Sequence, residues 1–130
     1  MSRKHSLVLK KIGWYAATAF IALHGIAHFV GTMIIFDPTH ELYSTTILWD
    51  TIDLGNVGFL VWGGLYTASG VVFVVSAVGM VLHRWWWKRL LFSVTILSLL
   101  LTFGDLDLAY TGFVINVVIM MGFVVNDRVQ

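Results

Sequence analysis

The sequence predicts an all-α integral membrane protein, an up-down bundle of four transmembrane helices with both termini in the cytoplasm. Hydrophobic residues make up 58% of the 130-residue chain and charged residues only 12%, whereas soluble domains are about a quarter charged. The apolar residues gather in four long stretches, and every Lys and Arg falls on one side of the resulting layout. A chain this short cannot bury so much apolar surface within itself, so the excess must face lipid.

Four segments are long enough to cross a membrane, which requires about 20 mostly apolar residues. We expect helices at about residues 12–36, 57–82, 86–103 and 108–125, in a single membrane domain that covers residues 1–130. The first segment has a basic start like that of a signal peptide, but it is too long and holds two histidines, so we expect a retained helix. Short connections after the second and third helices favour antiparallel neighbours.

The distribution of charge predicts the orientation of the bundle. Cytoplasmic loops are enriched in Lys and Arg, and all eight of these residues lie before the first helix, between the second and third, or after the fourth. Six of the seven acids lie on the opposite side. We therefore expect a multi-pass protein of the plasma (inner) membrane, with residues 37–56 forming an outer loop. Within this loop, Ser44 or Thr45 is a candidate cap for a short surface helix through Trp49.

Composition also limits the chemistry and the partners of the protein. The chain has no cysteine, which excludes disulfides, iron–sulfur clusters, thiol catalysis and Cys-based zinc sites. The few basic residues lie beside apolar spans, so we expect no nucleic-acid partner. We expect the lipid bilayer as the main partner, and a homo-oligomer or a larger membrane complex in which other subunits cover the small-residue faces of the helices.

Polar side chains inside a membrane span are costly and usually face the bundle interior. Here they recur every three or four residues on three of the expected helices, and residues at that spacing share a face. His24 and Asn116 fall near the middle of their spans, and the polar stripes continue toward the acidic side. We therefore expect a polar pocket that opens outward, with Asp105 at its mouth. Its expected lining is His24, His28, Thr32, Ser98, Thr102, Asp105 and Asn116.

The pair His24 and His28 is open to several interpretations. Hydrogen bonding between helices is the ordinary role of such side chains. Two imidazoles four residues apart can also bind one metal ion, although no glutamate follows His24, as the zinc-protease motif requires. Haem would use a single histidine, because two on one helix cannot reach both faces of the ring. A proton pathway is a further interpretation, although the polar stripe does not continue to the inner side.

Several segments carry a resemblance to known proteins. His-Gly-Ile-Ala-His-Phe-Val-Gly, residues 24–31, lies in the first span, and an acidic outer loop with Trp49 and Asp50 follows. The basic turn Arg84-Trp85-Trp86-Trp87 precedes the third helix, and residues 107–116 open the fourth. The chain thus resembles a group of small, poorly characterised prokaryotic four-span membrane proteins, and it is similar in size and layout to DoxX-like membrane proteins. This resemblance implies a compact inner-membrane bundle with quinone-linked or redox-partner roles, but it identifies no catalytic residue.

Two functions follow as expectations. The first is a small membrane subunit, or a binding or transport accessory, that uses the outward-facing His/Asn pocket. The alternative is a membrane-embedded redox enzyme or cofactor carrier that acts on a lipid-soluble substrate such as a quinone. In the alternative, His24 or His28 would serve as an acid/base group or as the ligand of a metal ion or haem.

Overall fold

The computed structural model describes residues 3–128, which form four helices and one small hairpin. The elements in chain order are α1 (Arg3–Phe36), β1 (Thr46–Ile47), β2 (Ile52–Asp53), α2 (Gly55–Val81), α3 (Trp87–Gly104) and α4 (Leu106–Arg128). Each of the four helices is long and apolar enough to cross a membrane. The predicted all-α class with four membrane-length helices is therefore confirmed, and the helices indicate a multi-pass membrane protein.

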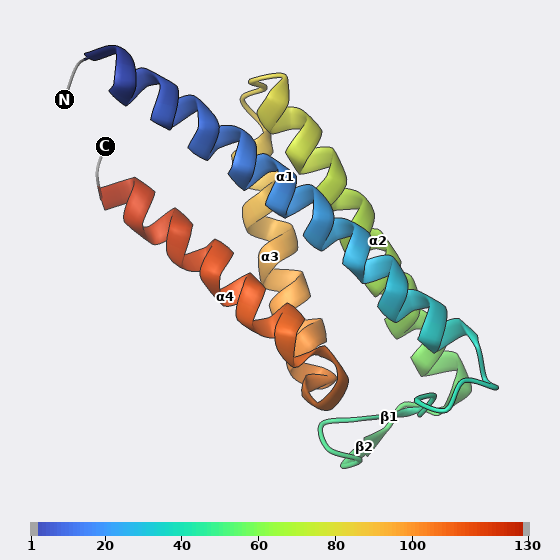
Figure 1. Ribbon diagram of the computed structural model, residues 1–130. Coiled ribbons are helices and arrows are strands. Elements are labelled where there is room, and N and C mark those ends of the chain that lie inside the picture. The colour runs from blue at the N-terminus through green and yellow to red at the C-terminus, as the bar shows by residue number, and fades with distance from the viewer. Residues whose placement is uncertain (1–2, 129–130) are drawn as a thin grey trace.

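Consecutive helices run in opposite directions, so the molecule has two distinct ends (Figure 1). The first residues of α1, the turn between α2 and α3 and the last residues of α4 share one end, and the hairpin and the α3–α4 connection share the other. We call the first the basic end, because it carries Lys10, Lys11, Arg84, Lys88 and Arg89. We call the second the hairpin end. The segregation of charge along the sequence thus becomes a segregation between the two ends of the bundle.

The largest difference from the expected boundaries is at the start of α1, which begins at Arg3 rather than near residue 12. Its 34 residues correspond to about 51 Å at 1.5 Å per residue. This exceeds the hydrocarbon thickness of roughly 30 Å, so the basic first turns continue the helix beyond the apolar layer. At the other end of the chain, α4 begins at Leu106, but Ala109 has non-helical backbone angles and kinks it. Regular helix therefore resumes close to the expected start at residue 108.

The expected surface helix through Trp49 is wrong, because this part of the loop forms a β-hairpin. Strands β1 and β2 pair antiparallel, with Thr46 opposite Asp53. At the tip, Leu48, Trp49 and Asp50 have φ angles of 52°, 54° and 61°. Non-glycine residues rarely adopt this left-handed conformation, and a right-handed helix cannot pass through it.

Two sets of hydrogen bonds hold the hairpin in place. The backbone N–H of Leu48 donates to the carbonyl of Gly104 at 2.7 Å, which joins the hairpin to the end of α3. The carboxylate of Asp53 accepts from the N–H of Gly55 and from the hydroxyl of Thr45, both at 2.8 Å. Gly55 has a φ of +62°, a conformation that glycine adopts without steric cost. The hairpin is therefore anchored at both the start of α2 and the end of α3.

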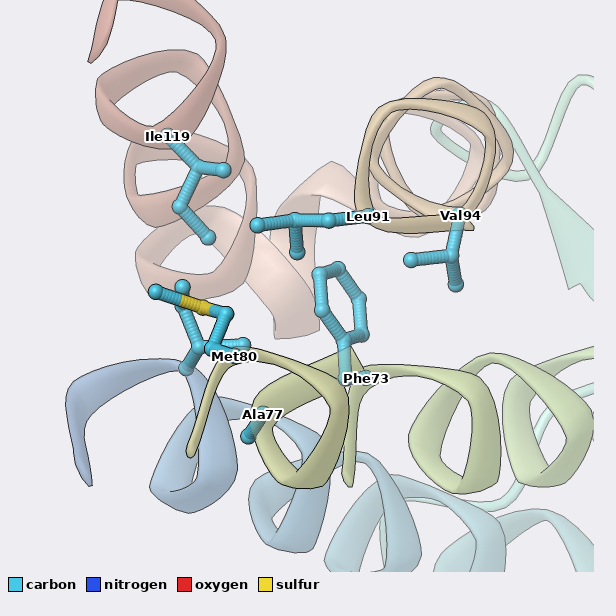
Figure 2. Packing of buried hydrophobic residues seen from close by; sticks show 7 residues of the cluster. Phe73, Ala77, Met80, Leu91, Val94 and Ile119 are labelled. Carbon is cyan, nitrogen blue, oxygen red and sulfur yellow. The ribbon is translucent and has the colours of Figure 1, made fainter. Parts of the chain in front are cut away.

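The interior has an apolar cluster in each half of the bundle. In the half near the basic end, the side chain of Phe73 rises from α2 toward Leu91 and Val94 of α3 (Figure 2). This basic-half cluster consists of Ile21, Phe73, Ala77, Met80, Leu91, Val94 and Ile119. The hairpin-half cluster consists of Ile35, Phe59, Tyr66 and Leu101. Buried polar side chains lie on the same helices between these clusters and form the candidate site.

Helices α1 and α2 touch backbone to backbone beside the two histidines. A Cβ atom on Gly25 would lie 2.8 Å from the carbonyl oxygen of Gly70, and one on Gly70 would lie 2.8 Å from the carbonyl oxygen of Gly25. Small residues at such contacts allow membrane helices to pack closely. This contact places the face of α1 that carries His24 and His28 directly against α2.

Candidate functional site

Four buried polar side chains from three helices form a continuous hydrogen-bond network. On α1 and α4, Nε2 of His24 lies 2.9 Å from Oδ1 of Asn116. The amide nitrogen of Asn116 donates to Oγ of Ser98 on α3 at 2.7 Å, and this Oγ lies 2.9 Å from Nε2 of His28. None of the four residues is more than 4% exposed. We call this set, His24, His28, Ser98 and Asn116, the His–Asn network.

The direction of each bond follows from the groups that Asn116 presents. Its amide oxygen can only accept, so His24 donates from Nε2, and its Nδ1 is left as an acceptor in the neutral ring. Its amide nitrogen donates to Ser98, whose hydroxyl is then free to donate to Nε2 of His28. In that arrangement His28 carries its proton on Nδ1. The two rings therefore present opposite groups at their Nδ1 atoms, an acceptor on His24 and a donor on His28.

Neither of these two Nδ1 atoms has a hydrogen-bond partner within residues 3–128, although both are buried. The same is true of the hydroxyl of Ser69 on α2. A buried polar group without a partner costs about 1–3 kcal/mol, and such groups are uncommon in folded proteins. The network thus satisfies one nitrogen of each imidazole and leaves the other available to a ligand or a water molecule.

Aromatic side chains of α2 surround the histidine rings. The ring centroid of Phe73 lies 4.8 Å from that of His24 and 5.5 Å from that of His28, and Tyr66 lies 5.4 Å from His28. Neither Tyr66 nor Phe73 is predicted as part of the site from the sequence. The available signal was a seven-residue repeat of large buried side chains on α2, at Phe59, Tyr66, Phe73 and Met80. Such a repeat is typical of ordinary helix packing, so it did not point to a site.

Thr32 and Thr102 lie at the edge of the network. The hydroxyl of Thr32 donates to the carbonyl of His28 at 3.0 Å and accepts from Thr67 of α2 at 3.2 Å. The hydroxyl of Thr102 donates to the carbonyl of Ser98 at 2.7 Å and lies 3.4 Å from the amide nitrogen of Asn116. Both hydroxyls therefore bond mainly to the preceding turn of their own helix, as Ser and Thr commonly do in helices.

Asp105 lies between α3 and α4, where its carboxylate accepts a hydrogen bond from Nε1 of Trp62 at 2.8 Å. Burial raises the pKa of Asp105, and the hydrogen bond from Trp62 partly offsets this effect. The residue lines a hollow of about 190 Å³ under the hairpin, together with Asp50 and Asp107. The structure therefore places Asp105 at the hairpin end, next to Trp62, and does not join it to the His–Asn network by a hydrogen bond.

The residues present do not fit a complete metal site. Across residues 3–128 no three His, Asp or Glu side chains are grouped to hold a metal ion, whereas a structural zinc ion takes four ligands. The histidine pair offers only two free nitrogens, because each Nε2 is already hydrogen bonded. A metal ion at the Nδ1 atoms would need its remaining ligands from water, a substrate or another subunit.

The half of the bundle near the basic end offers no continuation of the network. The basic-half cluster packs there against His24, and the hydroxyls at this depth are used locally. Thr18, Ser76 and Thr95 each donate to the backbone carbonyl four residues earlier. Toward the hairpin end, in contrast, the polar groups of Tyr66, Trp62 and Asp105 follow. Within residues 3–128 the hydroxyls on the basic side therefore bond to their own helices and not to the network, and Nε1 of Trp14 has no partner.

Comparison of the chain with protein-family models, with curated proteins and with solved structures finds no match. The resemblance to DoxX-like membrane proteins therefore stays a prediction. The function has to be inferred from the hydrogen bonding and the surroundings of the His–Asn network.

Proposed function

We propose that this protein is a small inner-membrane subunit, or a binding or transport accessory, that receives a ligand at the His–Asn network. The observation that carries the proposal is the pair of buried Nδ1 atoms on His24 and His28 that have no partner within the described chain. A polar site that is buried, ordered by hydrogen bonds and incompletely satisfied is typical of ligand-binding positions. Ionisable residues inside membrane spans are functional candidates for the same reason.

In this proposal the ligand approaches from the hairpin end, which faces the outside. Polar groups that are near the network lie on that side, whereas the opposite side is packed by the basic-half cluster, and its hydroxyls bond to their own helices. The basic residues of the bundle gather at the other end, and the positive-inside rule assigns that end, with both termini, to the cytoplasm. The bundle therefore acts as a receptor for a compound that arrives at the outer half of the membrane.

A second candidate function is a carrier of a lipid-soluble redox compound such as a quinone. The observation that favours it is the pairing of one donor and one acceptor nitrogen with the rings of Tyr66 and Phe73. Aromatic side chains suit a flat ring, and a few placed polar groups orient it. A head group with a hydroxyl or carbonyl substituent matches this combination.

The proposal includes association with a further subunit. Helix α4 has little of its span buried within the chain, and Val117, Val118 and Met121 are exposed on it. In a membrane this surface contacts lipid or another protein. A partner subunit there would cover α4, the helix that carries Asn116. Blue-native electrophoresis and cross-linking through a cysteine at Val118 distinguish a homo-oligomer from a monomer.

The test is to purify the protein in lipid nanodiscs and to identify what it retains. Visible spectroscopy detects haem, elemental analysis detects metal, and extraction followed by mass spectrometry detects quinones and other small molecules. We expect a stoichiometric compound that is lost in His24→Ala and His28→Ala. The control His40→Ala changes a histidine outside the bundle core, whose Nδ1 accepts from the N–H of Leu42, and it should retain the compound. Retention that is unchanged in all three variants would overturn the proposal.

The identity of the compound separates the two candidates. A quinone or a haem that depends on the histidines favours the redox carrier. A colourless compound without redox activity favours the binding subunit. If added candidate compounds and the native membrane extract all fail to bind the wild-type protein, both candidates are wrong and the network is purely structural.

A further inference from the structure

A second feature lies outside the His–Asn network, on the surface between α1 and α2 near the basic end. Here the two helices leave a groove of about 400 Å³ whose walls are almost entirely apolar. Several wall positions are alanines, so the helix surfaces are recessed between larger neighbours. The lining residues are Tyr15, Thr18, Ala19, Ala22, Val74, Ala77, Val78, Val81 and Leu82.

Two basic residues lie just beyond the lining residues in the sequence, on the side of the basic end. Lys11 lies one helical turn before Tyr15 and therefore on the same face of α1. Arg84 follows Leu82 by two residues, just beyond the end of α2. Its backbone N–H donates to the carbonyl of Gly79. Both side chains are exposed. Toward the basic end, the apolar lining is thus followed by one cation on α1 and one in the turn after α2.

We propose that this groove binds an anionic phospholipid, with one acyl chain along the groove and the phosphate between Lys11 and Arg84. From Tyr15 to Ala22 the groove covers about 10 Å at 1.5 Å per residue, which matches the upper part of an acyl chain. Basic residues at the membrane surface attract anionic lipids, and basic pockets between helices bind their head groups. Trp85 is 76% exposed beside Arg84, and tryptophan favours the same head-group level.

The charges also argue against a second copy of the chain as the occupant. A symmetric, parallel dimer uses the same surface on both subunits, so a dimer through this groove would bring the two basic ends together. That end carries all eight Lys and Arg residues and a single acid, Asp127 near the end of α4, so a large excess of positive charge would face its copy. A neutral phospholipid would fill the apolar groove without using either cation. An anionic lipid is the occupant that complements both parts of the site.

The experiment compares lipid retention by native mass spectrometry after release from nanodiscs of equal phosphatidylglycerol and phosphatidylcholine. We expect the wild-type protein to retain phosphatidylglycerol preferentially. Surface cations each contribute about 1 kcal/mol to binding of anionic lipid, or roughly fivefold each. Lys11→Gln combined with Arg84→Gln should therefore reduce the preference by about 25-fold, and Lys11→Arg should preserve it.

The control removes two other charges from the same end, with Lys88→Gln and Arg89→Gln. These side chains lie on α3, over the rings of Trp87 and Trp85, whereas the groove lies between α1 and α2, so their removal should leave most of the preference. Ala19→Leu fills the groove at an exposed position and should reduce retention of both lipids. Three results would each overturn the proposal. The first is an equal loss of phosphatidylglycerol preference in the control and the test variant, and the second is equal retention of the two lipids by the wild type. The third is efficient dimer cross-linking through Ala19→Cys. None of these results bears on the His–Asn network.

Discussion

Nε2 of His24 donates to the side-chain oxygen of Asn116 at 2.9 Å, across 92 positions of the sequence. This bond joins the first helix to the last. The same asparagine also donates to Ser98, so a single amide holds α1, α3 and α4 together in the interior of the bundle.

Replacing Asn116 tests this linking role directly. Asn116→Ala leaves the Nε2–H of His24 and the hydroxyl of Ser98 without their buried partner. We expect the free energy of unfolding to fall by about 1–3 kcal/mol, the usual cost of an unsatisfied buried polar group. Equilibrium unfolding in detergent, followed by circular dichroism, measures the change. Asn56→Ala removes an exposed amide in the first turn of α2 and should have little effect, so an equal loss in both variants would contradict the prediction.

The backbone contact between α1 and α2 predicts a strong effect of a single methyl group. In Gly25→Ala the new Cβ would lie 2.8 Å from both the carbonyl oxygen of Gly70 and the Cβ of Phe73. Overpacking of this kind costs about 1–3 kcal/mol. Gly64→Ala on α2 is the matched control, because a Cβ there meets nothing within 4 Å and alanine favours helix by up to about 1 kcal/mol. The thermal midpoints of the two variants should therefore move in opposite directions.

The burial of Asp105 makes the hairpin end sensitive to pH, and the indole of Trp62, which donates to this carboxyl group, reports on its titration. Burial favours the neutral form of Asp105 and raises its pKa. Stability that depends on the neutral carboxyl is therefore complete at low pH and is lost as pH rises through the raised pKa. We expect the indole ¹⁵N–¹H resonance of Trp62 to titrate with a midpoint above the ordinary range of aspartate. Asp105→Asn should abolish the titration and Asp107→Asn should keep it, whereas a midpoint at the ordinary value would show that the carboxyl is well hydrated.

The absence of native cysteine allows the orientation to be measured without background. Thr51→Cys places a thiol on the exposed tip of the hairpin, and Trp85→Cys places one at the basic end. A membrane-impermeant maleimide added to intact cells should label the first and not the second. Labelling of the second only would invert the orientation, and with it the side from which a ligand approaches.

The helices and half of the site were predictable from sequence for physical reasons. The chain has four apolar stretches, and each is long enough to cross a bilayer, so the number of helices can be predicted directly. The spacing of His24 and His28 places them on one face whatever the tertiary packing. Burial of this polar face then directs it toward polar side chains of the other helices, and Ser98 and Asn116 are the ones that the two histidines meet. The His–Asn network follows from helical periodicity together with the cost of an unpaired polar group in an apolar interior.

Other features depend on contacts that periodicity does not encode. Tyr66 and Phe73 have the spacing of ordinary core residues, and only the close approach at Gly25 shows that they meet the histidines. The hairpin depends on three successive left-handed residues, Leu48 to Asp50, and their side chains give no local signal for that conformation. In the fold, the backbone of Leu48 is hydrogen bonded to Gly104 at the end of α3. Local propensity would not predict this contact between distant residues.

The apolar packing below His24 has a consequence for any movement of charge. A proton that reaches the imidazole from the hairpin end next meets the apolar side chains of Ile21, Phe73 and their neighbours. The buried hydroxyls in that half are bonded to their own helices. Within residues 3–128 no chain of side-chain hydrogen bonds leads from His24 to the basic end. Sustained proton flux would therefore require water or another polypeptide to bridge this apolar stretch.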